Sequence, residues 1–124
     1  MTIFKYPEGL SYARNAGADL SGDLNKIAHV DTDGDIVLAG AGEHAIGTII
    51  EAAIADKPVT IQFGGIAKVI LGGTVTAGQR VASDAAGLGV NAGSADDYEI
   101  GTALTSGLVN EVIPVMLLPG KAHS

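Results

Sequence analysis

The sequence predicts an all-β protein: a small β-sandwich or barrel with glycine-rich turns and an extended N-terminal arm. Short apolar runs rich in valine and isoleucine recur about every ten residues, and glycine or acidic turns separate them. No stretch has the strand–long helix–strand rhythm of a parallel α/β fold. The 124-residue chain holds 18 glycines and no cysteine, so turns are plentiful and disulfides are excluded.

Residues 1–18 differ from the rest of the chain. They hold three of its five aromatic residues, Phe4, Tyr6 and Tyr12, and show neither a helical nor an alternating period. We therefore expect an extended arm over residues 1–18 and one β-rich domain over residues 19–124. Fifteen extended residues reach about 50 Å, so such an arm can contact a neighbouring molecule. The alternative is that the arm folds back and completes its own core.

The clearest local structure is a hairpin after the arm. Residues 26–30 and 36–39 are expected strands, and the Asp-Gly pair at 33–34 between them is typical of a tight turn.

Residues 43–55 are ambiguous between helix and strand. Several isoleucines and Ala53 fall on one helical face, but Gly47 and its β-branched neighbours disfavour a helix interior. We favour a strand over residues 46–52.

The remaining strands are expected where short apolar runs lie between turns: 59–63, 66–71, the end of 74–81, a short segment within 84–97, 98–104 and 110–118. In the first of these, alternation predicts that Val59, Ile61 and Phe63 share a half-buried face. Pro114 lies inside the last run, so that strand should be an edge, carry a bulge or turn its missing donor outward. No repeat of fixed period is evident.

The charge balance argues against several classes of partner. Fourteen acidic residues against seven basic ones give a net charge of −7, which disfavours binding to nucleic acid or to an anionic membrane. No stretch approaches the ~20 apolar residues that span a bilayer. Residues 1–10 lack the apolar core of a secretory signal, so we expect synthesis in a reducing cytoplasm.

The acidic hairpin tip superficially matches a calcium loop. Asp31, Asp33 and Asp35 alternate as calcium ligands do, but the sixth and twelfth places hold Ile36 and Gly42 instead of glycine and glutamate. We interpret the tip as a solvated turn and expect no metal there.

No constellation of catalytic residues stands out. His29, His44 and His123 form no HExxH pattern, and no serine has a GxSxG context. The glycine-rich residues 87–93 lack the GK[ST] ending of a phosphate loop. We therefore expect no enzyme activity, cofactor or metal centre.

Five short segments carry a resemblance to a known family: residues 26–38, 65–69, 72–81, 100–104 and 111–118. In their order and spacing, the run from residue 19 to 118 resembles the capsid cement, or head-decoration, proteins of tailed bacteriophages.

The resemblance implies a small structural protein, made in the host cytoplasm, that binds the outer capsid surface of the virion. Such proteins usually sit as homotrimers and clamp neighbouring subunits of the major capsid protein. The arm then provides the candidate capsid-binding residues, Phe4, Tyr6 and Tyr12, because aromatic side chains are common anchors of interfaces.

The alternative function is a small β-barrel accessory or ligand-binding domain of an enzyme complex. Residues 75–81 loosely resemble the turns of biotinyl or lipoyl carriers. Such carriers need a lysine at a hairpin tip, whereas Lys57 precedes a proline and Lys68 lies within an expected strand.

Overall fold

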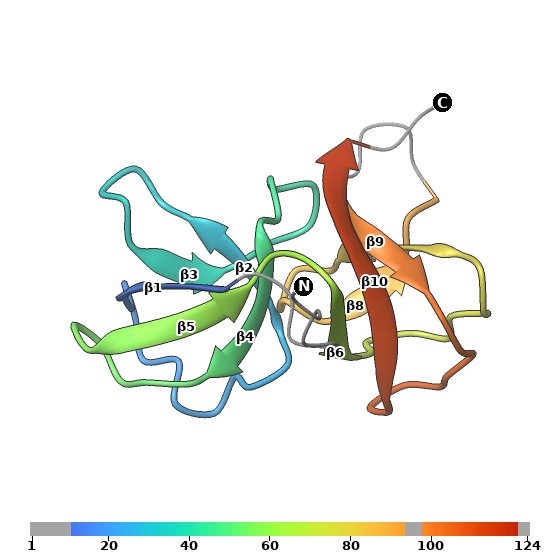
Figure 1. Ribbon diagram of the computed structural model, residues 1–124, viewed down its shortest axis with the longest axis horizontal. Coiled ribbons are helices and arrows are strands. Elements are labelled where there is room, and N and C mark those ends of the chain that lie inside the picture. The colour runs from blue at the N-terminus through green and yellow to red at the C-terminus, as the bar shows by residue number, and fades with distance from the viewer. Residues whose placement is uncertain (1–10, 94–97, 122–124) are drawn as a thin grey trace, which may run out of the picture.

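The chain folds into two antiparallel sheets of five strands each. The computed structural model describes residues 11–93 and 98–121, and this part of the chain contains no helix. The first sheet has the order β1-β5-β4-β2-β3, and the second has the order β6-β10-β9-β7-β8. Figure 1 shows the two sheets side by side. The predicted all-β fold is confirmed: the sheets are not closed into a barrel and are consistent with the predicted β-sandwich.

The first half of the chain supplies the first sheet. Its strands are β1 (Ser11–Asn15), β2 (Ile27–Val30), β3 (Ile36–Leu38), β4 (Gly47–Glu51) and β5 (Pro58–Gln62). The second half supplies the second sheet. Its strands are β6 (Ile66–Ile70), β7 (Arg80–Ser83), β8 (Gly89–Asn91), β9 (Tyr98–Ala103) and β10 (Val112–Lys121).

Most of the predicted strands are confirmed, including β4 in the ambiguous segment. Phe63 is an exception: it follows the end of β5 and is 37% exposed, while Val59 and Ile61 are buried as predicted. Phe63 is more exposed than Val59 and Ile61 because it lies one residue past the end of β5, before the turn through Gly64, and its partial burial agrees with a half-buried face.

Pro114 lies in a central strand, since β10 pairs with both β6 and β9. The β9–β10 ladder begins at the next residue, Val115, and shifts its register between Leu117 and Gly120. Pro114 accepts a hydrogen bond from the N–H of Leu104 (3.0 Å) through its carbonyl and sits where this ladder ends. The proline is therefore tolerated at a ladder end, in a strand that also carries a bulge.

Residues 11–18 of the predicted arm lie within the domain. Ser11–Asn15 forms β1, which pairs along its whole length with β5. Ala16 is fully buried, and Gly17 donates its N–H to the carbonyl of Ile36 (2.8 Å). The first part of the predicted arm, residues 1–10, lies outside the described residues.

The two halves share one topology. If the strands of each half are counted in chain order, both sheets have the order first, fifth, fourth, second, third. A single parallel bridge also joins the edges of each sheet, Ala16 to Ile36 in the first and Leu71 to Gly89 in the second. The chain is therefore an internal repeat, and the prediction that it contains none is wrong.

The β2–β3 turn is built around one aspartate. The Oδ1 atom of Asp31 accepts hydrogen bonds from the N–H groups of Asp33 and Asp35, both at 2.9 Å. Gly34 has a φ of 84°, in the left-handed region that glycine adopts without strain. The predicted tight turn is confirmed. Its first carboxylate, that of Asp31, already accepts hydrogen bonds from the backbone of the turn itself.

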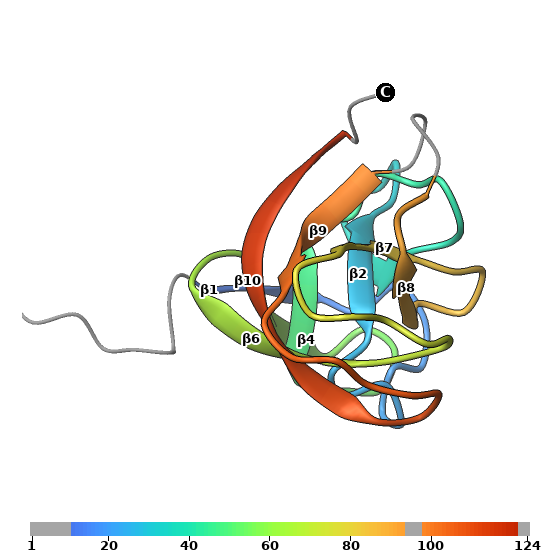
Figure 2. The same cartoon turned by 90° about the vertical axis from the view of Figure 1, so that its right-hand side faces the viewer.

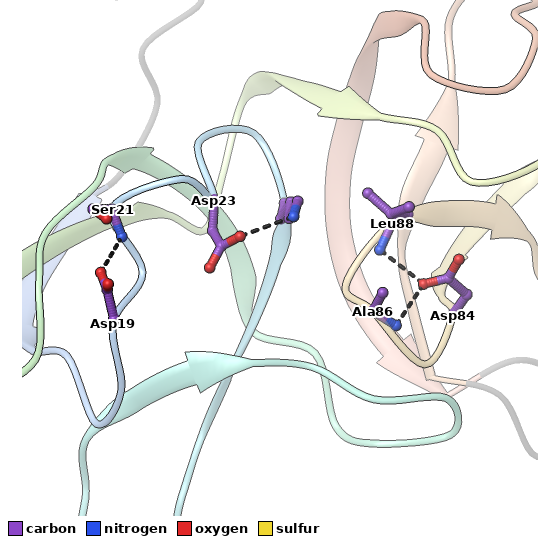
Figure 3. Close-up of polar contacts among 7 residues, drawn as sticks. Asp19, Ser21, Asp23, Asp84, Ala86 and Leu88 are labelled. Atoms are coloured by element: carbon purple, nitrogen blue, oxygen red, sulfur yellow. Dashed lines mark hydrogen bonds and ion pairs between the residues drawn. The ribbon is translucent and has the colours of Figure 1, made fainter.

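The β7–β8 turn repeats this arrangement at the matching place in the second half. The Oδ1 atom of Asp84 accepts hydrogen bonds from the N–H groups of Ala86 (2.8 Å) and Leu88 (3.0 Å), as Figure 3 shows. Gly87 has a φ of 78°. An Asp-x-x-Gly sequence therefore makes the same turn twice.

The turns before the fifth strand of each half also match. Asp56 (φ 66°) donates its N–H to the carbonyl of Ala16 (2.9 Å), and Asn110 (φ 71°) donates to that of Leu71 (2.8 Å). Asparagine and aspartate adopt this left-handed conformation more readily than other non-glycine residues do.

A third matching feature is a close backbone crossing. A Cβ atom on Gly47 would overlap the carbonyl oxygen of Gln62, and one on Gly101 would overlap that of Met116. Each glycine lies between an isoleucine and a threonine. Only glycine fits at such a close approach of two strands.

The loop before β2 is held by its own acidic residues (Figure 3). Hydrogen bonds from the hydroxyl and the backbone N–H of Ser21 lower the pKa of the Asp19 carboxyl. Asp23 pairs with Lys26 at 2.8 Å.

Each half has its own apolar core, and the second core extends into the first half. The first core consists of first-half residues alone: Ala16, Leu20, Ala28, Ile36, Ile49, Val59 and Ile61. The second core contains ten second-half residues together with Ile27, Ala39 and Ala45. These three fully buried side chains join the halves into one domain.

We predict that Gly34→Val destabilises the protein by about 1–2 kcal/mol or more, because a β-branched residue is strained at positive φ. Gly22→Val is the control, since Gly22 lies in an exposed turn with open space around it and no positive φ. Urea denaturation measures both. Equal stability of the two variants would contradict the turn geometry.

We predict that Ile27→Ala lowers the free energy of unfolding by about 2–5 kcal/mol, the usual cost of a large buried aliphatic side chain. Val30→Ala, at a 37% exposed position of the same strand, should cost far less. Guanidinium denaturation compares them. A small effect at Ile27 would show that this contact does not hold the halves together.

Candidate docking surfaces

Tyr12 forms one wall of an open apolar pocket at the edge of the first sheet. The pocket has a volume of about 360 Å³. Tyr12 is 47% exposed and Phe63 is 37% exposed. The other lining residues are His44, Ala45, Ile46 and Ile61. We call this site the Tyr12 pocket.

The internal repeat explains why the Tyr12 pocket is open. Ala67 and Leu117 occupy the positions in the second half that match Tyr12 and Phe63, and they are only 4% and 5% exposed. They belong to the second core, which Ile27, Ala39 and Ala45 of the first half help to cover. Among the described residues, the first core receives none from the second half. The pocket therefore lies on the half whose core lacks such a cover, and Ala45 in its lining also belongs to the second core.

The histidines near the pocket have partners within the fold. His44 stacks on Tyr98 with ring centroids 4.7 Å apart and an angle of 23° between the planes. The Nδ1 of His29 hydrogen-bonds the His44 carbonyl oxygen (3.1 Å), and its Nε2 lies 3.9 Å from Glu43 Oε2. His123, the third histidine of the sequence, lies outside the described residues.

A second candidate surface is the outer face of the second sheet. Along β10, Ile113, Val115 and Leu117 point into the core, and the residues between them are not buried. The outer face consists of Ile66, Lys68, Ile70, Thr102, Leu104, Val112, Pro114, Met116 and Leu118, with Arg80 at its edge opposite Thr102. Figure 2 shows β10 curving along one side of the molecule next to β9. Val112, Met116 and Leu118 are 46%, 43% and 77% exposed.

The sequence contains a pattern that indicates this outer face, which we did not predict. Residues 112–118 are apolar without interruption. Such a run is typical of a strand that is covered on both faces, whereas alternation marks a strand covered on one.

A further hollow lies where the two sheets meet. This junction pocket has a volume of about 350 Å³. It is lined by Leu24, Asn25, Ile50, Gln62, Ile66, Ala67 and Lys68. It adjoins the outer face of the second sheet through Ile66 and Lys68, and Leu24 and Ile50 extend the exposed apolar surface onto the first half.

The fold has a counterpart among solved structures. No protein-family model and no curated protein matches the sequence. The chain is similar in structure to the N base of head fibre gp8.5 of bacteriophage phi29, with a TM-score of 0.70 and 12% sequence identity. The match covers 93% of this chain and 98% of that one. At this identity the likeness shows a shared fold.

The structure brings one of the three predicted anchor residues into a candidate site. Tyr12 lines the pocket and directly follows Ser11, the first described residue. Phe4 and Tyr6 lie outside the described residues.

No helix among the described residues is long and apolar enough to cross a membrane. The same residues contain no group of three side chains arranged to hold a metal ion.

We predict that calcium titration by calorimetry detects no micromolar site at the tip formed by Asp31–Asp35. One oxygen of Asp31 accepts two backbone hydrogen bonds, and Ile36 and Gly42 stand where a calcium loop needs glycine and glutamate. Asp33→Asn serves as the comparison. Micromolar binding that is lost in this variant would contradict the prediction.

Proposed function

We propose that this protein is a structural component of a phage head, a cement protein that binds the outer capsid surface and stabilises contacts between major capsid subunits. The likeness to the base of a phage head fibre over nearly the whole length of both chains carries the proposal. The sequence resemblance to head-decoration proteins supports it independently. No catalytic step is part of this function.

The N-terminal region provides the contact with the capsid in this proposal. Residues 1–10 lead directly into Ser11, and the next residue, Tyr12, lines an open apolar pocket. Phe4, Tyr6 and Tyr12 anchor on a capsid subunit, and the Tyr12 pocket receives an apolar side chain from it. Such pockets and aromatic anchors commonly dominate binding energy.

The symmetry of the shell makes weak contacts sufficient. The protein binds as a homotrimer, because closed three-fold symmetry matches the three-fold positions of a capsid. When several contacts are linked in one particle, each bound contact raises the effective concentration for the next, so the total affinity exceeds that of a single contact. The net charge of −7 opposes binding to nucleic acid.

The test is cosedimentation with purified heads of the phage that encodes the chain. We predict that Phe4→Ala with Tyr6→Ala weakens binding roughly tenfold or more, and that Tyr12→Ala does so to a lesser degree. Ile54→Ala is the control, since Ile54 is 54% exposed on the loop between β4 and β5 and does not line the pocket.

Circular dichroism should show all variants folded. Wild-type protein that fails to bind heads would refute the proposed function. Full binding by the Phe4/Tyr6 variant would refute only the role of the arm.

A further inference from the structure

We propose that the outer face of the second sheet binds a second copy of this chain. The inference deepens the proposed function, on which it rests for the presence of several copies, by naming the surface through which they meet. It assigns the Tyr12 pocket and the outer face to different partners: the capsid and the neighbouring copy.

The internal repeat provides the first argument, because it gives a built-in comparison of matching positions. In the first sheet, Ser11 lies opposite Gln62, and the matching pair in the second sheet is Ile66 opposite Met116.

The next matching pair behaves in the same way. Asn15 lies opposite Pro58, and its counterpart is Ile70 opposite Val112. At these two pairs of positions, the first sheet carries polar or small side chains and the second sheet carries large apolar ones. The fold itself does not require the apolar residues, so they serve a contact outside it.

Charge provides the second argument, and it favours a second copy as the partner. The outer face carries Lys68 and, at its edge, Arg80, which pairs with Glu99 at 2.6 Å, whereas the chain as a whole carries a net charge of −7. Two acidic molecules that meet through this face bring few carboxylates together. A second copy also supplies acids in excess for Lys68, such as the exposed Glu111 next to Val112.

Extent provides the third argument. The outer face continues through the junction pocket to Leu24 and Ile50, which are 50% and 37% exposed. Scattered single apolar residues are normal on a protein surface, but a continuous apolar area across two sheets marks an interaction site. A large apolar patch that carries few charged residues fits the anatomy of a protein interface.

The experiment is analytical ultracentrifugation of the full chain over a wide concentration range. We expect wild-type protein to form oligomers and Val112→Asp with Met116→Asp to be monomeric or to associate at least tenfold more weakly. Ala13→Asp with Asn15→Asp adds the same charge to the matching face of the first sheet, opposite Thr60 and Pro58. This control should associate as wild type does.

Thermal unfolding verifies that the variants are folded. If the double variant does not fold, Leu118→Ser replaces it, since Leu118 is 77% exposed and its loss leaves the core intact. Wild-type protein that stays monomeric at millimolar concentration would overturn the proposal, as would oligomers that the substitutions leave unchanged.

Head cosedimentation separates this inference from the proposed function. Monomeric wild-type protein that binds heads through the outer face, so that Val112→Asp with Met116→Asp abolishes binding, would assign the face to the capsid instead. That result would refute self-association and retain the proposed function. Wild-type oligomers that do not bind heads would refute the proposed function and retain self-association through the outer face.

Discussion

The rest of the structure depends on the contact through which the first half closes the second core. Strand β2 serves both cores, since Ala28 points into the first and its neighbour Ile27 into the second. The position that matches Ile27 in the second half is Arg80, which pairs with the nearly buried Glu99 at 2.6 Å. A polar pair at the matching place ends the stacking after two units, as polar capping units do in longer repeat proteins.

Local turn chemistry and alternation made most of the strands predictable. The Asp31–Asp35 turn depends on residues that lie next to each other in sequence, and the burial of Val59 and Ile61 follows from period two. The internal repeat could not be recognised from the sequence. The halves share backbone geometry at many positions but few residue identities, chiefly Ile-Gly-Thr and Asp-x-x-Gly. Many different apolar side chains fill equivalent core positions, so sequence similarity faded while the fold persisted.

The candidate surfaces were predictable only in part. Tyr12 stood out because aromatic residues are rare in this chain, and the structure places it at a pocket. The partners that form this pocket come from separate strands, so no local pattern joins them. The outer face was not predicted because we expected strands with one buried face and one solvent-exposed face. Residues 112–118 are apolar on both faces.

The single parallel bridges that join the edges of each sheet affect how the sheets can pair with strands of neighbouring molecules. A bridge at Ala16–Ile36 and another at Leu71–Gly89 bring the ends of the two edge strands of each sheet together. At these points the edge backbone is paired within the fold and cannot recruit strands from other molecules, which is the usual route to fibrous aggregates. In the proposed function, copies that lie beside one another on the capsid then meet through side chains rather than through edge strands.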